Sequence, residues 1–265
     1  MQPLRFEPTD RTLVERVVRH ERAVVLATLI AVTLACWSWI VPMARDMYGA
    51  MTGPSAWMMT GVWDTPHFLL LGAMWIVMMA GMMLPSAAPV LLLYAGAARR
   101  RSGERHAAWR VYAMAAGYLL VWAAFSVCAT VLQRILSARL VLSPMMELTS
   151  PLLSGALLIV AGVYQLTPLK RACLASCSAP LVFLTHRWRD GATGAFRLGV
   201  EHGLSCLGCC WALMLLLFAG GVMNLAVIGA LTAFVLFEKL VPLGAASVRF
   251  TGIFLIALGV WVIAG

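Results

Sequence analysis

The sequence predicts an all-α protein, a polytopic transmembrane helix bundle of about seven spans. Hydrophobic residues make up 62% of its 265 residues and charged residues only 12%, whereas soluble domains are about 45–50% apolar and about 25% charged. The mean hydropathy of +0.88 supports the same conclusion. Because a membrane helix needs about 20 mostly apolar residues, the chain has room for roughly six to eight of them and little else. A soluble globular enzyme is excluded, and the lipid bilayer is the first expected partner.

Each predicted span is an apolar run bounded by charges, glycine or proline. Residues 1–22 carry arginines and apolar residues at helical spacing, which predicts a cytoplasmic amphipathic segment on the membrane surface. Residues 23–265 are expected to form a single transmembrane helical domain. Its spans are predicted at about 23–41, 67–98, 111–132, 152–167, 195–220, 223–240 and 248–264. Pro85 and Pro89 in the second span favour a kinked or tilted helix.

The basic residues orient this bundle. With seven spans and a cytoplasmic amino terminus, all but three of the 20 Lys and Arg residues fall on the inner side, the exceptions being Arg45, Arg134 and Arg139. Cytoplasmic loops of membrane proteins collect Lys and Arg. The asymmetry therefore explains the formal net charge of +9 without any nucleic acid partner.

The main candidate site lies in the fifth predicted span. His202, Cys206, Cys209 and Cys210 stand at helical offsets that place them on one face. Thiolate and thioether sulfurs favour Cu(I), and the imidazole adds a nitrogen donor. The helix spreads these donors over roughly 12 Å, so further ligands have to come from another helix. Glu201, an ionisable residue in the same span, is a candidate acceptor or proton relay beside the ligands.

Two other segments supply candidate ligands. Met78 and Met82 lie at i, i+4 spacing near the middle of the second span, at a depth similar to that of the fifth-span donors. Cys173 and Cys177 follow the fourth span and share one face if that segment is helical, which suggests a cytoplasmic transfer site for a metal. All four also have a purely structural interpretation, because methionine and cysteine pack well in helix cores.

The remaining sulfur and charged residues receive structural interpretations. Cys36 and Cys128 are interpreted as packing residues. Glu238 and Lys239 end the sixth predicted span, where the simplest interpretation is an interfacial ion pair whose lysine extends to the lipid headgroups. Seven cysteines are an odd number in a chain with no secreted domain, so free thiols are expected rather than a complete disulfide framework.

Three motifs carry a resemblance to a known family. They are Trp75 with MMAGMMLP at 78–85, PLKRACLASCSAP at 168–180, and CLGCCWALM at 206–214. Together they resemble a bacterial family of predicted metal-binding integral membrane proteins of unknown function, over about residues 68–240. The resemblance implies a multi-pass protein of the bacterial inner (cytoplasmic) membrane, with a metal site built from His202, Cys206, Cys209 and Cys210, joined by Cys173 and Cys177.

The sequence therefore favours a protein that binds, relays or transports a soft transition metal, above all Cu(I), between its second and fifth spans. Its expected partner is a metal chaperone or a membrane complex. Two alternatives stay open. Cys206 and Cys209 have the C-x-x-C spacing of a thiol-disulfide oxidoreductase, although burial in the membrane suppresses a reactive thiolate. The third hypothesis is a non-catalytic assembly subunit, and no catalytic residue is assigned because no known catalytic motif is present.

Overall fold

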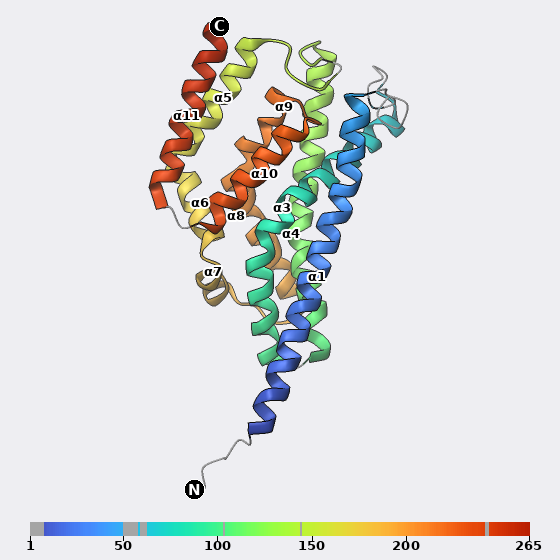
Figure 1. Ribbon diagram of the computed structural model, residues 1–265, viewed down its shortest axis with the longest axis vertical. Helices are drawn as coiled ribbons and strands as arrows, with labels where there is room; N and C mark the ends of the chain where they lie inside the picture. Colours follow the sequence, from blue (N-terminus) through green and yellow to red (C-terminus); the bar gives the residue numbers. More distant parts are fainter. Residues whose placement is uncertain (1–7, 50–57, 59–62, 103, 144, 242–243) are drawn as a thin grey trace.

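The computed structural model describes residues 8–49, 58, 63–102, 104–143, 145–241 and 244–265, and this part of the chain is almost entirely helical. The predicted all-α class is confirmed. Figure 1 shows one elongated bundle, in which the first described residues and the carboxyl-terminal helix lie at opposite ends. Its helices are α1 (Pro8–Met47), α3 (Thr65–Ser102), α4 (Glu104–Ala138), α5 (Pro151–Leu166), α6 (Pro168–Ser178), α7 (Pro180–Arg187), α8 (Gly191–Leu215), α9 (Leu217–Gly220), α10 (Leu225–Leu240) and α11 (Gly244–Ala264).

Five helical segments are long and apolar enough to cross a membrane, and a sixth crossing is possible where α5 and α6 meet at a bend of 67°. The predicted count of seven is not confirmed among the described residues. The difference lies in α10, which has 16 residues and so is about 24 Å long, short of the ~30 Å hydrocarbon core. The sequence pattern overestimated its length because the apolar run begins in a turn. Asn224 ends that turn and caps α10 by accepting from the backbone N–H of Ala226 at 3.0 Å.

The predicted surface segment continues directly into the first span. α1 begins at Pro8 and runs without a break to Met47, and Figure 1 shows its first turns projecting beyond the other helices. Residues 1–7 lie outside the described residues. The position of segment 1–22 on the membrane surface therefore stays a prediction, and its described part shares one helix with the span.

α3 passes through Pro85 and Pro89 as a continuous helix. Pro85 has no N–H, so the carbonyl of Gly81 loses its usual partner in the helix. The indole Nε1 of Trp37 on α1 donates to that carbonyl at 3.3 Å. A Cβ at Gly81 would lie only 3.0 Å from the Cβ of Cys36, so the two helices pack closely here. The packing interpretation of Cys36 agrees with this contact.

α4 and α8 cross with their backbones in contact. A Cβ at Gly117 of α4 would overlap the backbone of α8, and a Cβ at Gly199 of α8 would overlap the carbonyl oxygen of Met114. Small residues permit such close crossings between membrane helices. The crossing stacks the ring of Tyr118 on that of His202, with 5.7 Å between their centroids. The fold thus brings a residue of α4 to the sulfur-rich face of α8.

Replacing Gly199 by alanine is expected to lower the free energy of unfolding by about 1–3 kcal/mol, the usual range for overpacking. Gly229 of α10 is the matched control, because a Cβ there meets nothing within 4 Å, and alanine favours a helix by up to ~1 kcal/mol over glycine. Thermal unfolding of both variants in one detergent measures the difference. Equal midpoints would contradict a tight crossing.

α5 and α11 form a second close pair, seen side by side in Figure 1. A Cβ at Gly162 of α5 would lie 2.7 Å from the carbonyl oxygen of Gly252, and a Cβ at Gly259 of α11 would lie 2.6 Å from that of Gly155. The opposite face of α11 exposes large apolar side chains, namely Phe250, Ile253, Phe254 and Trp261. An exposed apolar face of this extent fits contact with lipid.

Candidate metal centre

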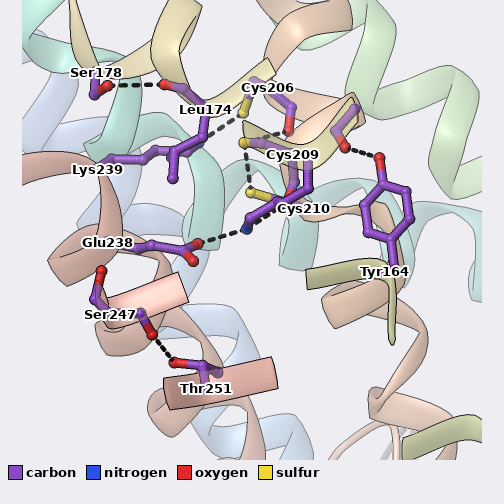
Figure 2. A network of polar contacts seen from close by, with 12 residues as sticks. Tyr164, Leu174, Ser178, Cys206, Cys209, Cys210, Glu238, Lys239, Ser247 and Thr251 are labelled. Carbon is purple, nitrogen blue, oxygen red and sulfur yellow. Dashed lines mark hydrogen bonds and ion pairs between the residues drawn. The ribbon is translucent and has the colours of Figure 1, made fainter. Parts of the chain in front are cut away.

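Four cysteines from two helices meet in the interior of the bundle. Cys206, Cys209 and Cys210 of α8 are at most 1% exposed. Cys177 of α6 is also buried, and its thiol lies beside those of Cys206 and Cys209. The Sγ atoms of Cys209 and Cys210 are 3.2 Å apart, and the Cys209 thiol donates to the carbonyl oxygen of Cys206 at 3.1 Å. Figure 2 shows the three α8 sulfurs facing α10. We call Cys177, Cys206, Cys209 and Cys210 the thiol cluster.

A buried lysine contacts this cluster directly. The Nζ of Lys239 on α10 donates to the Sγ of Cys206 at 2.8 Å and to the Oγ of Ser86 on α3 at 3.0 Å. The hydroxyl of Tyr118 lies 3.1 Å from the same Sγ and donates to the carbonyl oxygen of Met83 at 2.9 Å. Cys206 is therefore held by polar groups from α4 and α10, and a full positive charge lies beside its sulfur.

A second lysine ties the helices around the cluster together. The Nζ of Lys170 on α6 donates to Oε2 of Glu238 at 2.6 Å and to the carbonyl oxygen of Cys209 at 2.7 Å. The two side chains of this ion pair are 0% and 2% exposed. Oε1 of Glu238 has no hydrogen-bond partner among the described residues. The pair links α6, α8 and α10 at the level of the sulfurs, and part of this network is visible in Figure 2.

The interpretation of Glu238 and Lys239 as an interfacial pair was wrong. Both residues are buried, at 6% and 8% exposure, and they do not pair with each other. Neighbouring residues on a helix project about 100° apart, so Glu238 reaches Lys170 while Lys239 reaches Cys206. The signal that identifies them is the cost of a charge within an apolar helix, which makes such residues functional candidates. Tyr118 and Ser86 give no comparable signal in the sequence.

His202 lies one turn before Cys206 and has an open ring nitrogen. The side chain is 3% exposed and lies between aromatic rings, with centroids 5.7 Å from Tyr118 and 5.2 Å from Phe183. Its Nδ1 has no hydrogen-bond partner within the described part of the chain. Buried polar atoms are normally paired, so this nitrogen is available to a ligand.

The predicted methionine ligands lie on the face of α3 that carries Ser86. Met78 and Met82 are completely buried. They stand two turns and one turn before Ser86, on the same face of the helix. Because Ser86 accepts from Lys239, the methionine stripe leads to the edge of the thiol cluster. Direct coordination by either thioether stays a prediction.

Cys173 and Glu201, the other predicted site residues, have partners outside the thiol cluster. Cys173 is only half-buried, and its Sγ packs on α8 at Gly208, where a Cβ would lie 2.6 Å from it. Of the predicted Cys173–Cys177 pair, Cys177 is therefore buried in the thiol cluster, whereas Cys173 is half-buried against Gly208. Glu201 accepts from Arg187 at 3.1 Å and from Arg189 at 2.8 Å. These ion pairs explain why an acidic residue is present at this position. The predicted role of Glu201 beside a metal stays a prediction.

The donor chemistry of the cluster suits a soft ion, although its thiols contact one another. All seven cysteines are free. Among the described residues, no group of three or more His, Cys, Asp or Glu side chains is arranged to hold a metal ion. Sulfur donors select Cu(I) over hard cations, and the carboxylate of Glu238, a hard donor, is engaged by Lys170. A metal would have to replace the thiol hydrogen bonds.

A cavity of about 490 Å³ lies next to the cluster, between α6, α10 and the start of α11. Leu174 and Ser178 line it from α6, Lys239 from α10 and Ser247 from α11, and Figure 2 shows these four residues around the same space. Lys239 belongs both to the wall of this cavity and to the contact with Cys206. The side chain of Lys239 therefore lies between this wall of the cavity and the sulfur of Cys206.

The comparisons with known proteins identify the family. Residues 72–262 match the family PpoB2, described as copper chaperone. The matched range covers more than two thirds of the chain and contains the entire thiol cluster with both buried lysines. No curated protein and no solved structure is similar enough to the chain to match it. The match supports a copper-related family, rather than the family of unknown function that the motifs resemble. The chain therefore belongs to the PpoB2 family of copper chaperones.

Proposed function

We propose that this chain is a multi-pass protein of the bacterial inner membrane that takes up Cu(I) as cargo on the thiol cluster and passes it to a partner. The observation that carries the proposal is the convergence of four buried thiols from α6 and α8 beside the ammonium group of Lys239. The family match supports copper as the cargo. The apolar helices are compatible with a membrane location.

The charge of Lys239 suits a copper thiolate. A thiol that binds copper releases its proton, so Cu(I) held by two thiolates carries one net negative charge. An uncompensated charge is costly in the membrane interior. The ammonium at 2.8 Å from Cys206 neutralises it, and the Lys170–Glu238 pair already balances itself. Cys206, Cys209 and Cys210 are the proposed sulfur ligands, two of them as thiolates at a time and the third as a thiol, with His202, Met78 and Met82 as additional donors.

Transfer, rather than permanent storage, fits the arrangement of the thiols. The cysteines hydrogen-bond to one another and do not surround a preformed metal position in the described residues. Binding then requires rearrangement, which favours exchange of the ion with another thiol ligand. Cys177 connects the cluster to α6, whose neighbouring Ser178 lines the cavity. We propose that copper enters or leaves along this side, to or from a metal chaperone or a membrane complex.

Elemental analysis of the detergent-purified protein, prepared under reducing conditions, tests the proposal. We expect about one copper per chain from the soft donor set, with zinc and iron measured in the same sample as controls. Thiol titration distinguishes the alternatives. A thiol-disulfide oxidoreductase would lose two thiols, those of Cys206 and Cys209, when reductant is removed. An assembly subunit would contain intact thiols, no metal and a firmly bound partner protein.

A further inference from the structure

A second cavity, of about 270 Å³, lies where α5 ends and α11 begins. Its lining combines three polar side chains with three apolar ones, namely Gln165, Arg171 and Arg249 with Leu166, Val248 and Ile253. This place is the boundary of two apolar helices, because the span Ala246–Ala264 starts there and α5 stops at Leu166. The cavity is distinct from the one beside the thiol cluster, although Arg171 and Val248 border both.

Gln165 brings unsatisfied hydrogen-bonding groups to this cavity. The residue is only 1% exposed, and neither its Oε1 nor its Nε2 has a partner among the described residues. A side-chain amide offers two donors and one acceptor. Leaving such a group buried and unpaired costs about 1–3 kcal/mol. A polar ligand at this position would remove that cost.

Two arginines on different helices supply positive charge. Arg171 on α6 and Arg249 on α11 are both exposed, and neither forms an ion pair within the described ranges. Glu238, an acidic residue on the neighbouring α10, is occupied by Lys170. Guanidinium groups match the oxygen atoms of a phosphate with paired hydrogen bonds. The charged side of the cavity therefore suits an anion with several acceptor oxygens.

We propose that this cavity binds the phosphate of an anionic phospholipid headgroup. Arg171 and Arg249 contact the phosphate oxygens, and the amide of Gln165 donates to the headgroup. The apolar side of the cavity and the exposed face of α11, with Phe250 and Ile253, receive the acyl chains. Basic pockets between helices at a membrane surface are suited to such lipids. Free inorganic phosphate offers the same polar groups, but it has no apolar part that could pack on the apolar wall of the cavity.

Native mass spectrometry of the full chain, with added phosphatidylglycerol or phosphatidylcholine, tests this site. We expect preferential retention of phosphatidylglycerol, and about tenfold weaker retention after Arg171→Gln with Arg249→Gln, because charge-assisted hydrogen bonds are lost. Arg134→Gln with Arg139→Gln is the charge-matched control at a distant place and should leave retention unchanged. Equal retention in the two double variants would overturn the proposal.

Two further measurements complete the test. Gln165→Leu removes the amide and keeps the volume and both charges, so reduced retention in this variant supports the site even if the double variant folds poorly. Thermal unfolding with inorganic phosphate in place of lipid identifies the source of the phosphate. Stabilisation by inorganic phosphate equal to that by phosphatidylglycerol would overturn the lipid assignment. None of these readouts involves copper, so the outcome is independent of the proposed function.

Discussion

A variant in which Cys206 and Cys210 are both replaced by serine is expected to lose its copper, from about one ion per chain to background, because serine oxygen is a hard and poor ligand for Cu(I). The two residues flank Cys209 and are completely buried, so no other thiol of α8 can take over both positions. Elemental analysis after desalting measures the loss. We expect partial loss when only one of the two is replaced, because two of the three proposed sulfur ligands on α8 then remain.

The control for this experiment uses two other cysteines of the same chain. Cys36 packs on α3, and Cys128 is exposed on α4, so replacing both by serine removes the same number of thiols without touching the cluster. Thermal unfolding of both variants without copper verifies that each is folded. Equal copper content in the two double variants, whether retained or lost, would refute the proposed site, because the effect would then not be specific to the cluster.

The Lys239→Met variant separates the role of charge from that of ligands. Every proposed ligand remains, while the ammonium at 2.8 Å from Cys206 is removed. The negative charge of the copper thiolate is then uncompensated in a low-dielectric interior, and copper should bind more weakly. Lys239→Arg keeps the charge and should recover part of the affinity. Competition against a Cu(I) chelator measures both.

Periodicity was sufficient to predict the helical class and the sulfur-bearing face of α8. Residues four apart face the same way on any helix, so His202 and Cys206 could be placed together without a structure. The number of spans was less predictable, because hydropathy windows join turns to helices, and α10 is shorter than its apolar run. Five helices, or six with the bent pair, have the length and composition of a span.

The partners of the cluster could not be predicted, because they depend on contacts between distant helices. Lys239 and Cys206 are 33 residues apart, and Ser86 and Lys239 are 153 residues apart. Nothing in local spacing pairs Cys177 with Cys206 rather than with Cys173. The cost of burying charge was the one usable signal, and it applied to Lys239 as fully as it did to Glu201.

Replacing Lys170 by methionine is expected to lower the free energy of unfolding by about 3–5 kcal/mol, the usual range for breaking a buried ion pair. The change leaves the carboxylate of Glu238, with 2% side-chain exposure, without its cation. It also removes the donor to the carbonyl oxygen of Cys209. Chemical or thermal unfolding in a single detergent measures the loss.

Arg187→Met is the control, because it breaks an ion pair that solvent reaches. The side chains of Arg187 and Glu201 are 54% and 22% exposed. Exposed ion pairs contribute about 0–1 kcal/mol. The double variant Lys170→Met with Glu238→Gln should recover much of the stability, since no charge is then buried alone. If Lys170→Met is no less stable than Arg187→Met, the buried pair does not hold the bundle together. Because Lys170 joins α6 and α10 to the backbone at Cys209, the same variant should also weaken copper binding while all four thiols remain.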